Sequence, residues 1–218
     1  MTVHNLSEQN SLLKSFVSEI RDRNIQNDRL RFRRNIERIG ELMAYEISKT
    51  LDYYPAQVET PLGISDTHLP QDNLVIGTIL RAGLPFHHGF LNYMDKAENA
   101  FVSAYRKYKE NSDKFNIFIE YIASPSIENK VLILTDPMLA TGGSMELAYL
   151  ALATKGIPKH IHIASIIASK QAINYCLKKF PDANTTIWAA EVDPELNKHA
   201  YIIPGLGDAG DLAFGSKD

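Results

Sequence analysis

The segment 131–151, VLILTDPMLATGGSMELAYLA, restricts the fold of this chain more than any other stretch. Residues 131–134 are apolar and rich in β-branched side chains, which is typical of a buried strand. After Thr135 and Asp136 a short loop, PMLATGGS, leads into a helical pattern. A buried strand that passes through a short loop into a helix is the repeating unit of parallel α/β sheets, so the segment predicts an α/β fold.

Apolar segments alternate with helical patterns through much of the remaining chain. Further strands are expected at residues 74–80, 101–105, 115–122, 161–168 and 186–192, and helices at 144–155 and 171–179. Strand, helix, strand, helix, strand predicts a central, mostly parallel sheet with helices on both faces. Ligands bind such sheets beyond the carboxyl ends of the strands, so the residues that follow each strand are the candidates for a site.

The first part of the chain has a helical period. Apolar side chains recur at three- and four-residue steps from Ile36 to Ile47, which predicts a helix that ends near Asp52. The length suits one domain. We expect residues 1–218 to form it, with 1–52 as an N-terminal helical part and 198–218 as a C-terminal tail.

Charge and cysteine content argue against several classes of protein. The net charge of −3 disfavours a general binder of nucleic acid or membrane surfaces. Cys176 is the one cysteine, so no intrachain disulfide can form, which fits a reducing compartment. The polar N-terminus and the lack of an apolar run of roughly 18 residues predict a cytoplasmic protein with no membrane partner.

The loop between Asp136 and the following helix has the chemistry of a phosphate site. Small residues and glycines at 140–144 let the backbone approach an anion closely, and the start of the helix supplies free N–H groups and a favourable dipole. Asp136 would repel a phosphate but accepts hydrogen bonds from sugar hydroxyls. The segment therefore predicts a ribose 5-phosphate site, against the alternative of a plain turn. The chain has no GxxxxGK[ST] motif, and no GxGxxG follows a predicted strand, although a nucleoside-triphosphate site would be expected to carry one of the two.

Four segments resemble the type I phosphoribosyltransferases, and uracil phosphoribosyltransferases in particular. DPMLATGGS resembles the phosphoribosyl-diphosphate motif, ILRAGL at 79–84 the pyrophosphate loop, and Tyr105-Arg106 the second pyrophosphate arginine. YIIPGLGDAGD at 201–211 resembles the uracil-binding tail, which other phosphoribosyltransferases lack. The resemblance implies that fold, with a C-terminal hood over the base. It also implies transfer of the phosphoribosyl group of 5-phosphoribosyl 1-diphosphate to N1 of uracil, giving UMP and pyrophosphate.

The resemblance also implies the site residues. Those for phosphoribosyl diphosphate are Arg81, Ala82, Gly83, Arg106, Asp136, Pro137, Met138, Leu139, Ala140, Thr141, Gly142, Gly143, Ser144 and Asp208. Those for uracil are Ile202, Gly207, Asp208 and Ala209, and the catalytic pair is Asp208 and Arg81. Mg²⁺ is expected to be held through substrate and water, with no protein ligand assigned. A nucleotide effector such as GTP and a homodimer or higher homo-oligomer are further implications.

The composition of the C-terminal tail suggests how it could bind a base. Three glycines and a proline between Pro204 and Gly210 predict a turn-rich segment that is not helical. Its main-chain N–H and C=O groups could complement uracil and reject cytosine, whose amino group would leave buried groups unpaired. The alternative is a flexible terminus, which the apolar residues around the turn disfavour. Asp208 has no evident packing purpose within this turn.

Two rival functions remain open at this point. One is a regulator of the same fold that binds pyrimidine nucleotide and RNA, and the other is a transferase that acts on another base. The seven arginines between Arg21 and Arg38 could form a nucleic-acid surface, but a solvated helix face or a subunit contact is the favoured interpretation. His160 and His162 share a strand face and are interpreted as a satisfied or surface pair. The chain departs from the family in PFHH, after RAGL, and in residues 107–126.

Overall fold

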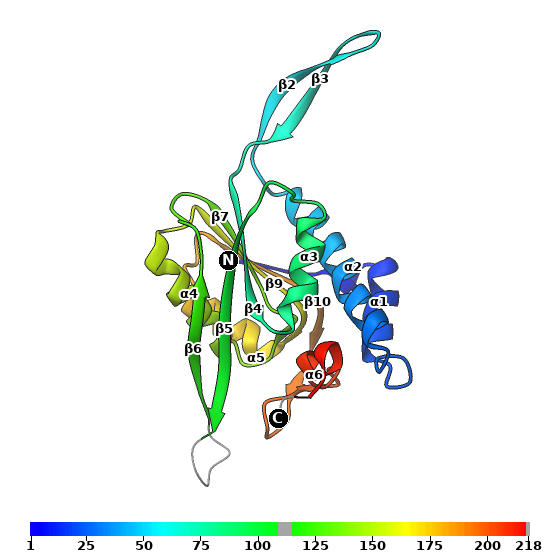
Figure 1. Ribbon diagram of the computed structural model, residues 1–218, viewed down its shortest axis with the longest axis vertical. Helices are drawn as coiled ribbons and strands as arrows, with labels where there is room; N and C mark the ends of the chain where they lie inside the picture. The colour runs from blue at the N-terminus through cyan, green and yellow to red at the C-terminus, as the bar shows by residue number, and fades with distance from the viewer. Residues whose placement is uncertain (109–114, 217–218) are drawn as a thin grey trace.

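The computed structural model describes residues 1–108 and 115–216, and within 104–119 it describes the backbone of the strands only (Figure 1). The strands are β1 (Thr2–Asn5), β2 (Tyr53–Thr60), β3 (Gly63–Pro70), β4 (Leu74–Leu80), β5 (Glu98–Tyr108), β6 (Phe115–Ala123), β7 (Val131–Thr135), β8 (Met138–Leu139), β9 (His160–Ser169), β10 (Thr185–Asp193), β11 (Glu195–Leu196) and β12 (Ile202–Ile203). The helices are α1 (Leu12–Arg21), α2 (Arg29–Ser48), α3 (Gly83–Leu91), α4 (Gly143–Leu152), α5 (Lys170–Lys179) and α6 (Ala209–Phe214), with 3-10 turns at Leu6–Glu8 and Ala153–Lys155.

The central sheet has the strand order β1-β10-β9-β7-β4-β5-β6, and β8 adds to β9. The main pairings are parallel except between β5 and β6, which are antiparallel. The expected α/β class and the mostly parallel sheet are therefore confirmed. All five further strands predicted from the sequence lie in this sheet.

Helices cover both faces of the sheet because strand residues alternate between them. Ile76, Ile133 and Trp188 point toward α1, α2 and α3, with which they form one apolar core. Val75 and Leu132, one residue away in each strand, point toward α4 and α5 in a second core. The alternation thus produces the three-layer arrangement seen in Figure 1.

The N-terminal helices form where a cap and an apolar stripe coincide. Asp28 caps α2, since its side chain accepts a hydrogen bond from the Arg31 amide. The apolar stripe from Ile36 to Ile47 is buried, as its period predicted, and α2 ends at Ser48, slightly before the expected Asp52. No helix in the described part of the chain is both long and apolar enough to cross a membrane.

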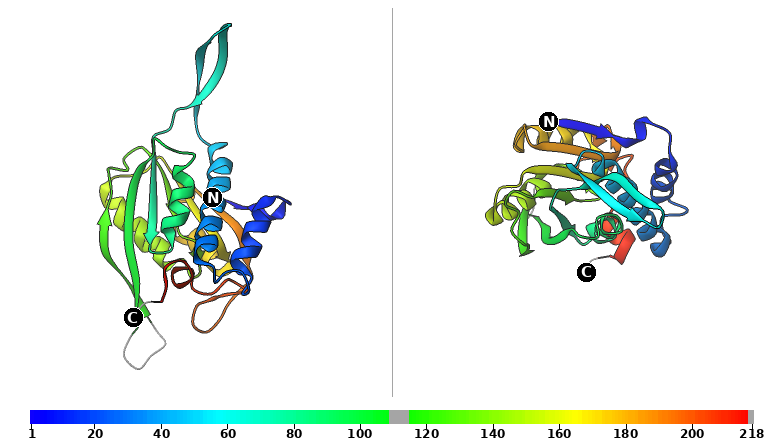
Figure 2. Two further views of the ribbon diagram at one scale, coloured as in Figure 1. Left: turned by 45° about the vertical axis from the view of Figure 1, so that its right-hand side comes forward. Right: turned by 90° about the horizontal axis from the view of Figure 1, so that it is seen from above.

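A two-stranded hairpin, β2 with β3, extends away from the body (Figures 1 and 2). Its side chains are exposed along most of both strands. The sequence analysis assigned no element to this stretch, because an arm without a buried face has no apolar alternation to detect. The hairpin and the C-terminal tail lie at opposite ends of the molecule (Figure 1).

Three expectations need correction at the level of elements. The helix expected at 144–155 begins one residue earlier and gives way to a 3-10 turn at Ala153. The tail, expected to contain no helix up to Gly210, forms α6 from Ala209 onward. Residues 2–5, for which no element was predicted, add β1 to the edge of the sheet beside β10. Short edge elements of this kind depend on partners that are distant in sequence.

Candidate active site

The carboxyl ends of the central strands meet at the end of the molecule where the tail lies (Figure 1). Strand β4 leads into Arg81 and β7 into Asp136, and Thr78 of β4 lies opposite Thr135 of β7 in the parallel register. Gly83 is packed into this junction, because an added Cβ would lie 2.3 Å from Oγ1 of Thr78. Only glycine fits there, so the loop 81–83 is held against the end of β7.

Two hydrogen bonds to serines of β9 fix the loop after Asp136. The amide of Leu139 donates to Oγ of Ser165 at 3.1 Å. The hydroxyl of Ser169 donates to the carbonyl of Ala140 at 2.6 Å and accepts from the amide of Ala172, the cap contact of α5. Since Ser165 and Ser169 are fully buried, these contacts are shielded from water. The sequence analysis missed both serines as positioning residues.

The phosphate loop turns into α4 at Gly142, which has a φ of +85°. This left-handed conformation favours glycine, and it directs the chain so that α4 begins at Gly143. The first amides of α4 have no intrahelical acceptor, which makes this end of the helix suited to an anion. Asp136, at the start of the same loop, is a half-buried carboxylate that accepts a hydrogen bond from the Met138 amide at 3.3 Å.

Asp208 has a structural contact that the sequence analysis did not foresee. Its Oδ1 accepts a hydrogen bond from the Asp211 amide at 3.0 Å and so caps α6. The inference that this carboxylate has no packing purpose was therefore wrong. Asp208 is half-buried, between Gly207, which has a φ of +94°, and the buried Ala209. Ile202 is buried as well, where β12 pairs with β11.

Arg81 links the loop after β4 to the tail. Its Nη2 donates to the carbonyl of Gly215 at 3.2 Å and to Oδ1 of Asp211 at 3.4 Å. The Leu80–Arg81 peptide is cis. The same nitrogen lies 3.8 Å from where a Cβ would stand on Gly210. Two segments singled out by sequence, RAG and GDAGD, are thus adjacent in space.

Arg106 is part of β5, opposite Ile117 of β6, but its side chain lies outside the described residues. Strand β5 runs parallel to β4 and continues beyond it. The backbone at Arg106 therefore lies beyond the end of β4, at the same edge of the sheet as the loop that begins at Arg81. Its predicted role stays a prediction.

The tail is anchored by an ion pair between the last residue of α1 and the last residue of β10. Arg21 and Asp193 form a two-pronged ion pair with both N–O distances at 2.9 Å. The same Asp193 accepts from the amide of Gly205 at 2.9 Å, and Arg21 donates to the Gly205 carbonyl at 3.2 Å. The turn at Gly205 is thereby fixed against the end of β10. Sequence reasoning missed this anchor, whose only signal was a carboxylate directly after a strand.

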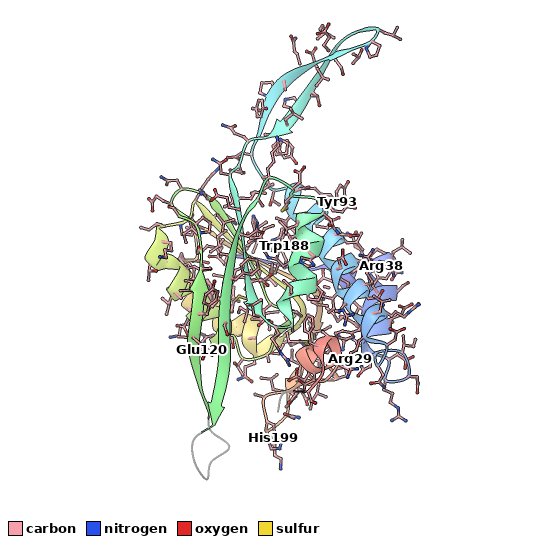
Figure 3. The ribbon with its side chains drawn as sticks, in the orientation of Figure 1. Arg29, Arg38, Tyr93, Glu120, Trp188 and His199 are labelled. Carbon is pink, nitrogen blue, oxygen red and sulfur yellow. The ribbon has the colours of Figure 1, made fainter. Side chains whose placement is uncertain are left out.

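Other arginines of the N-terminal helices also contact the tail. Arg33 donates to the carbonyl of Ala213 at 2.7 Å, and Arg29 lies beside α6, its Nη2 3.9 Å from a Cβ built on Gly215 (Figure 3). The interpretation of residues 21–38 as a solvated face or a subunit contact is therefore wrong for Arg21 and Arg33, which bind carbonyls of the same chain.

The histidines have structural surroundings. His160 and His162 share a strand face, as alternation predicted, with ring centroids 4.6 Å apart. Burial lowers the pKa of His162 to about 3, and Nε1 of Trp188 donates to its Nδ1 at 3.1 Å. His87 of α3 contacts Asn99 through Nε2 at 2.7 Å, and burial lowers its pKa. No three His, Cys, Asp or Glu side chains among the described residues converge into a metal site.

The arrangement suits a phosphorylated sugar with an anionic leaving group. A helix N-terminus preceded by a small-residue loop can bind a phosphate, and a neighbouring carboxylate can accept sugar hydroxyls. An exposed guanidinium at the end of the next strand can bind a further phosphate, and Asp208 lies in the adjacent tail.

Comparison with known proteins gives concordant matches. A family model described as uracil phosphoribosyltransferase matches residues 7–216. A uracil phosphoribosyltransferase of Porphyromonas gingivalis is 66% identical over 217 residues, covering 100% of both chains. One of Sulfolobus acidocaldarius is 37% identical over 223 residues, covering 99% of this chain and 100% of the other. The structure of the AQ2163 protein from Aquifex aeolicus matches with a TM-score of 0.86 at 28% identity, covering 98% of each chain.

Proposed function

The chain belongs to the uracil phosphoribosyltransferase family, and on this premise we propose how its residues join uracil to 5-phosphoribosyl 1-diphosphate. The reaction forms UMP and pyrophosphate. One observation supports this assignment of roles: the loops after β4 and β7 lie next to each other and next to the tail. Gly83 packs the first loop against the end of β7, and Arg81 binds the tail. We propose that residues 1–218 act as one phosphoribosyltransferase domain.

Phosphoribosyl diphosphate would bind along the carboxyl edge of the sheet. Residues 140–144 and the first amides of α4 would hold the 5-phosphate, and Asp136 would accept hydrogen bonds from the ribose hydroxyls. The guanidiniums of Arg81 and Arg106 would bind the pyrophosphate. Because charge on pyrophosphate grows as its bond to the anomeric carbon breaks, these cations stabilise the transition state more than the bound substrate.

Uracil would lie against the tail at Ile202 and residues 207–209. Anchoring of Gly205 by Asp193 supports this role, since a reading surface of main-chain groups must be rigid to discriminate between bases. Uracil N1 attacks the anomeric carbon and gives its proton to water, and pyrophosphate departs from the opposite face. Asp208 would stabilise positive charge on the ribose or orient a water near N1.

Magnesium fits this site as an ion that arrives with the substrate. The half-buried carboxylates of Asp136 and Asp208 are hard oxygen donors, the type that Mg²⁺ prefers, but they belong to different segments and do not form a protein cage. When bound, Mg²⁺ would supply positive charge that offsets the charge on the leaving group. Asp136 and Asp208 would contact its hydration shell.

A homodimer or a higher homo-oligomer is proposed from the hairpin. Leu62, at its tip, is fully exposed, and Ile64 and Val58 are 64% and 44% exposed. An isolated two-stranded hairpin is marginally stable in water, so packing of its apolar side chains on a second copy of the chain would stabilise it. The family also predicts an effector such as GTP, which a titration of GTP into the assay tests.

A direct assay with Arg81 variants tests this proposal. The protein with uracil, phosphoribosyl diphosphate and Mg²⁺ should release UMP and pyrophosphate in equal amounts. Arg81→Ala should lower kcat by on the order of 10²-fold, because the leaving group loses a cation. Arg81→Lys should recover only part, since the planar fork is lost. A normal kcat with only a raised KM in Arg81→Ala would remove its transition-state role.

The same fold could serve a regulator that binds RNA, but no observation favours it. Two of the arginines that suggested a nucleic-acid surface, Arg21 and Arg33, instead donate hydrogen bonds to carbonyls of the tail.

A further inference from the structure

The N-terminus of α4 carries a carboxylate that works against phosphate binding. Glu146 lies in the first turn of α4, two residues beyond Ser144, and its amide already closes the first helical hydrogen bond to Gly142 at 3.0 Å. Its side chain is 20% exposed. A carboxylate at this position is attracted by the helix dipole, but it would repel a phosphate held by the same helix end.

Two side chains of α5 occupy both oxygens of this carboxylate. The hydroxyl of Tyr175 donates to Oε2 of Glu146, and Nζ of Lys179 lies 3.3 Å from Oε1. Hydrogen bonding to Glu146 raises the pKa of Tyr175 to about 12, so the hydroxyl stays protonated and can donate throughout the pH range of an assay. The ammonium of Lys179 also lies 5.6 Å from the centre of the Tyr175 ring.

The ring of Tyr175 is also in contact with the phosphate loop. A Cβ placed on Gly142 would lie 2.7 Å from Cδ1 of Tyr175, so the ring packs directly against the glycine that turns the loop into α4. One residue therefore contacts the loop with its ring and the competing carboxylate with its hydroxyl. The hydroxyl takes no part in the contact with Gly142, because the Tyr175 atoms nearest to that Cβ are the ring carbons Cδ1 and Cγ.

We propose that Tyr175 is a positioning residue for the 5-phosphate site, and that with Lys179 it neutralises Glu146 so that the start of α4 remains attractive to phosphate. This inference rests on the proposed function, because it assumes that the phosphate of phosphoribosyl diphosphate binds at residues 140–144. The effect is on ground-state binding of a group remote from the bond that breaks. It therefore acts on the KM for phosphoribosyl diphosphate and leaves kcat unaffected.

The test begins with removal of the hydroxyl alone. Tyr175→Phe keeps the ring on Gly142, and we expect the KM for phosphoribosyl diphosphate to rise about fivefold, with kcat and the KM for uracil unchanged within twofold. Tyr149→Phe is the matched control. It makes the same deletion on α4, at a ring whose centroid lies 5.0 Å from that of Phe180. Lys179→Met should raise the same KM, and Lys178→Met, an exposed neighbour, should not.

A second change separates neutralisation from simple loss of a contact. Glu146→Gln removes the charge, so its KM should equal or fall below that of the unaltered protein. Added to Tyr175→Phe, it should restore a near-normal KM. If the contact mattered only for structure, Glu146→Gln would raise KM by itself and would not rescue Tyr175→Phe.

The outcomes distinguish this inference from the proposed function. An active enzyme in which Tyr175→Phe and Lys179→Met both keep a normal KM for phosphoribosyl diphosphate would overturn the role proposed for Tyr175 and Lys179 but not the proposed function. A double variant no better than Tyr175→Phe would overturn the neutralising role. Absence of UMP formation by the unaltered protein would instead refute the proposed function. Thermal unfolding of each variant checks that the fold is retained.

Discussion

At the scale of single residues, Asp208 caps α6 and is also proposed to act in catalysis, two roles that one carboxylate can fill. Its Oδ1 caps α6, and the rest of the carboxylate stays half-exposed in the tail near Arg81 and Gly210. The capping contact needs only an acceptor oxygen, which Asn supplies as well as Asp. The proposed catalytic contact needs the negative charge. A substitution that keeps the oxygen and removes the charge can therefore separate the two roles.

We expect Asp208→Asn to lower kcat by roughly 10²- to 10⁴-fold while leaving the melting temperature nearly unchanged. Asp208→Ala should lose the same activity and in addition about 1 kcal/mol of stability, because the cap of α6 is gone. Steady-state kinetics and thermal unfolding of both variants are the measurements. Normal turnover in Asp208→Asn would leave Asp208 as a cap alone.

At the scale of elements, the parts that could be predicted from sequence are those with a local signal. The strands of the central sheet are apolar runs, and the phosphate loop carries its glycines next to a strand end. The hairpin β2–β3 escaped prediction because its residues are exposed and show no burial period. The helix α6 escaped because Gly210 argues against a helix, while the cap at Asp208 and contacts with α2 stabilise one.

The anchor of the tail could not be read from sequence, since Arg21 and Asp193 are 172 positions apart and neither lies in a motif. The Asp193 carboxylate is only 5% exposed. Removal of either residue of this pair would leave the other charge buried without its partner, which lowers stability. The roles of the site residues, including Arg106, are still predictions of the family resemblance and of geometry.

Loss of this anchor should loosen the tail. Asp193→Ala leaves Arg21 without its ion-pair partner and the Gly205 amide without its acceptor, so we expect about 3 kcal/mol lower stability in urea unfolding and a raised KM for uracil. Asp182→Ala is the control. The Asp182 side chain, which pairs with the N-terminal amine, is 83% exposed, so this ion pair should contribute less than about 1 kcal/mol. Equal small effects of the two changes would refute the anchor.

At the scale of the whole molecule, the two proposed surfaces, for substrate and for self-association, lie at opposite ends. Its carboxyl edge carries the loops and the tail, while the hairpin extends from the opposite end (Figure 1). Substrate binding and self-association would therefore use different surfaces. Val58, Leu62 and Ile64 of the arm are apolar and exposed, which supports a second copy of the chain as their partner.

Charges on the arm should weaken self-association. We expect Leu62→Asp with Ile64→Asp to shift the molar mass in solution, measured by light scattering, toward that of the monomer, because two carboxylates would have to lose water in the contact. Leu150→Asp, at a 53% exposed leucine of α4, is the control and should leave the mass unchanged. A monomeric unaltered protein, or an unchanged mass in the double variant, would exclude the arm as a contact.

The central claim is that this chain forms UMP by reading uracil with its C-terminal tail, and competition between bases tests it most directly. Equal concentrations of uracil, cytosine, adenine and hypoxanthine are incubated with the protein, phosphoribosyl diphosphate and Mg²⁺, and the nucleotides formed are separated and quantified. We predict UMP as the product, with cytosine disfavoured by about 10⁴-fold, since its amino group would face a donor. In a separate assay with 5-fluorouracil as the base, the protein should also form the corresponding nucleotide. Formation of IMP, AMP or CMP at a rate comparable to that of UMP would contradict the account.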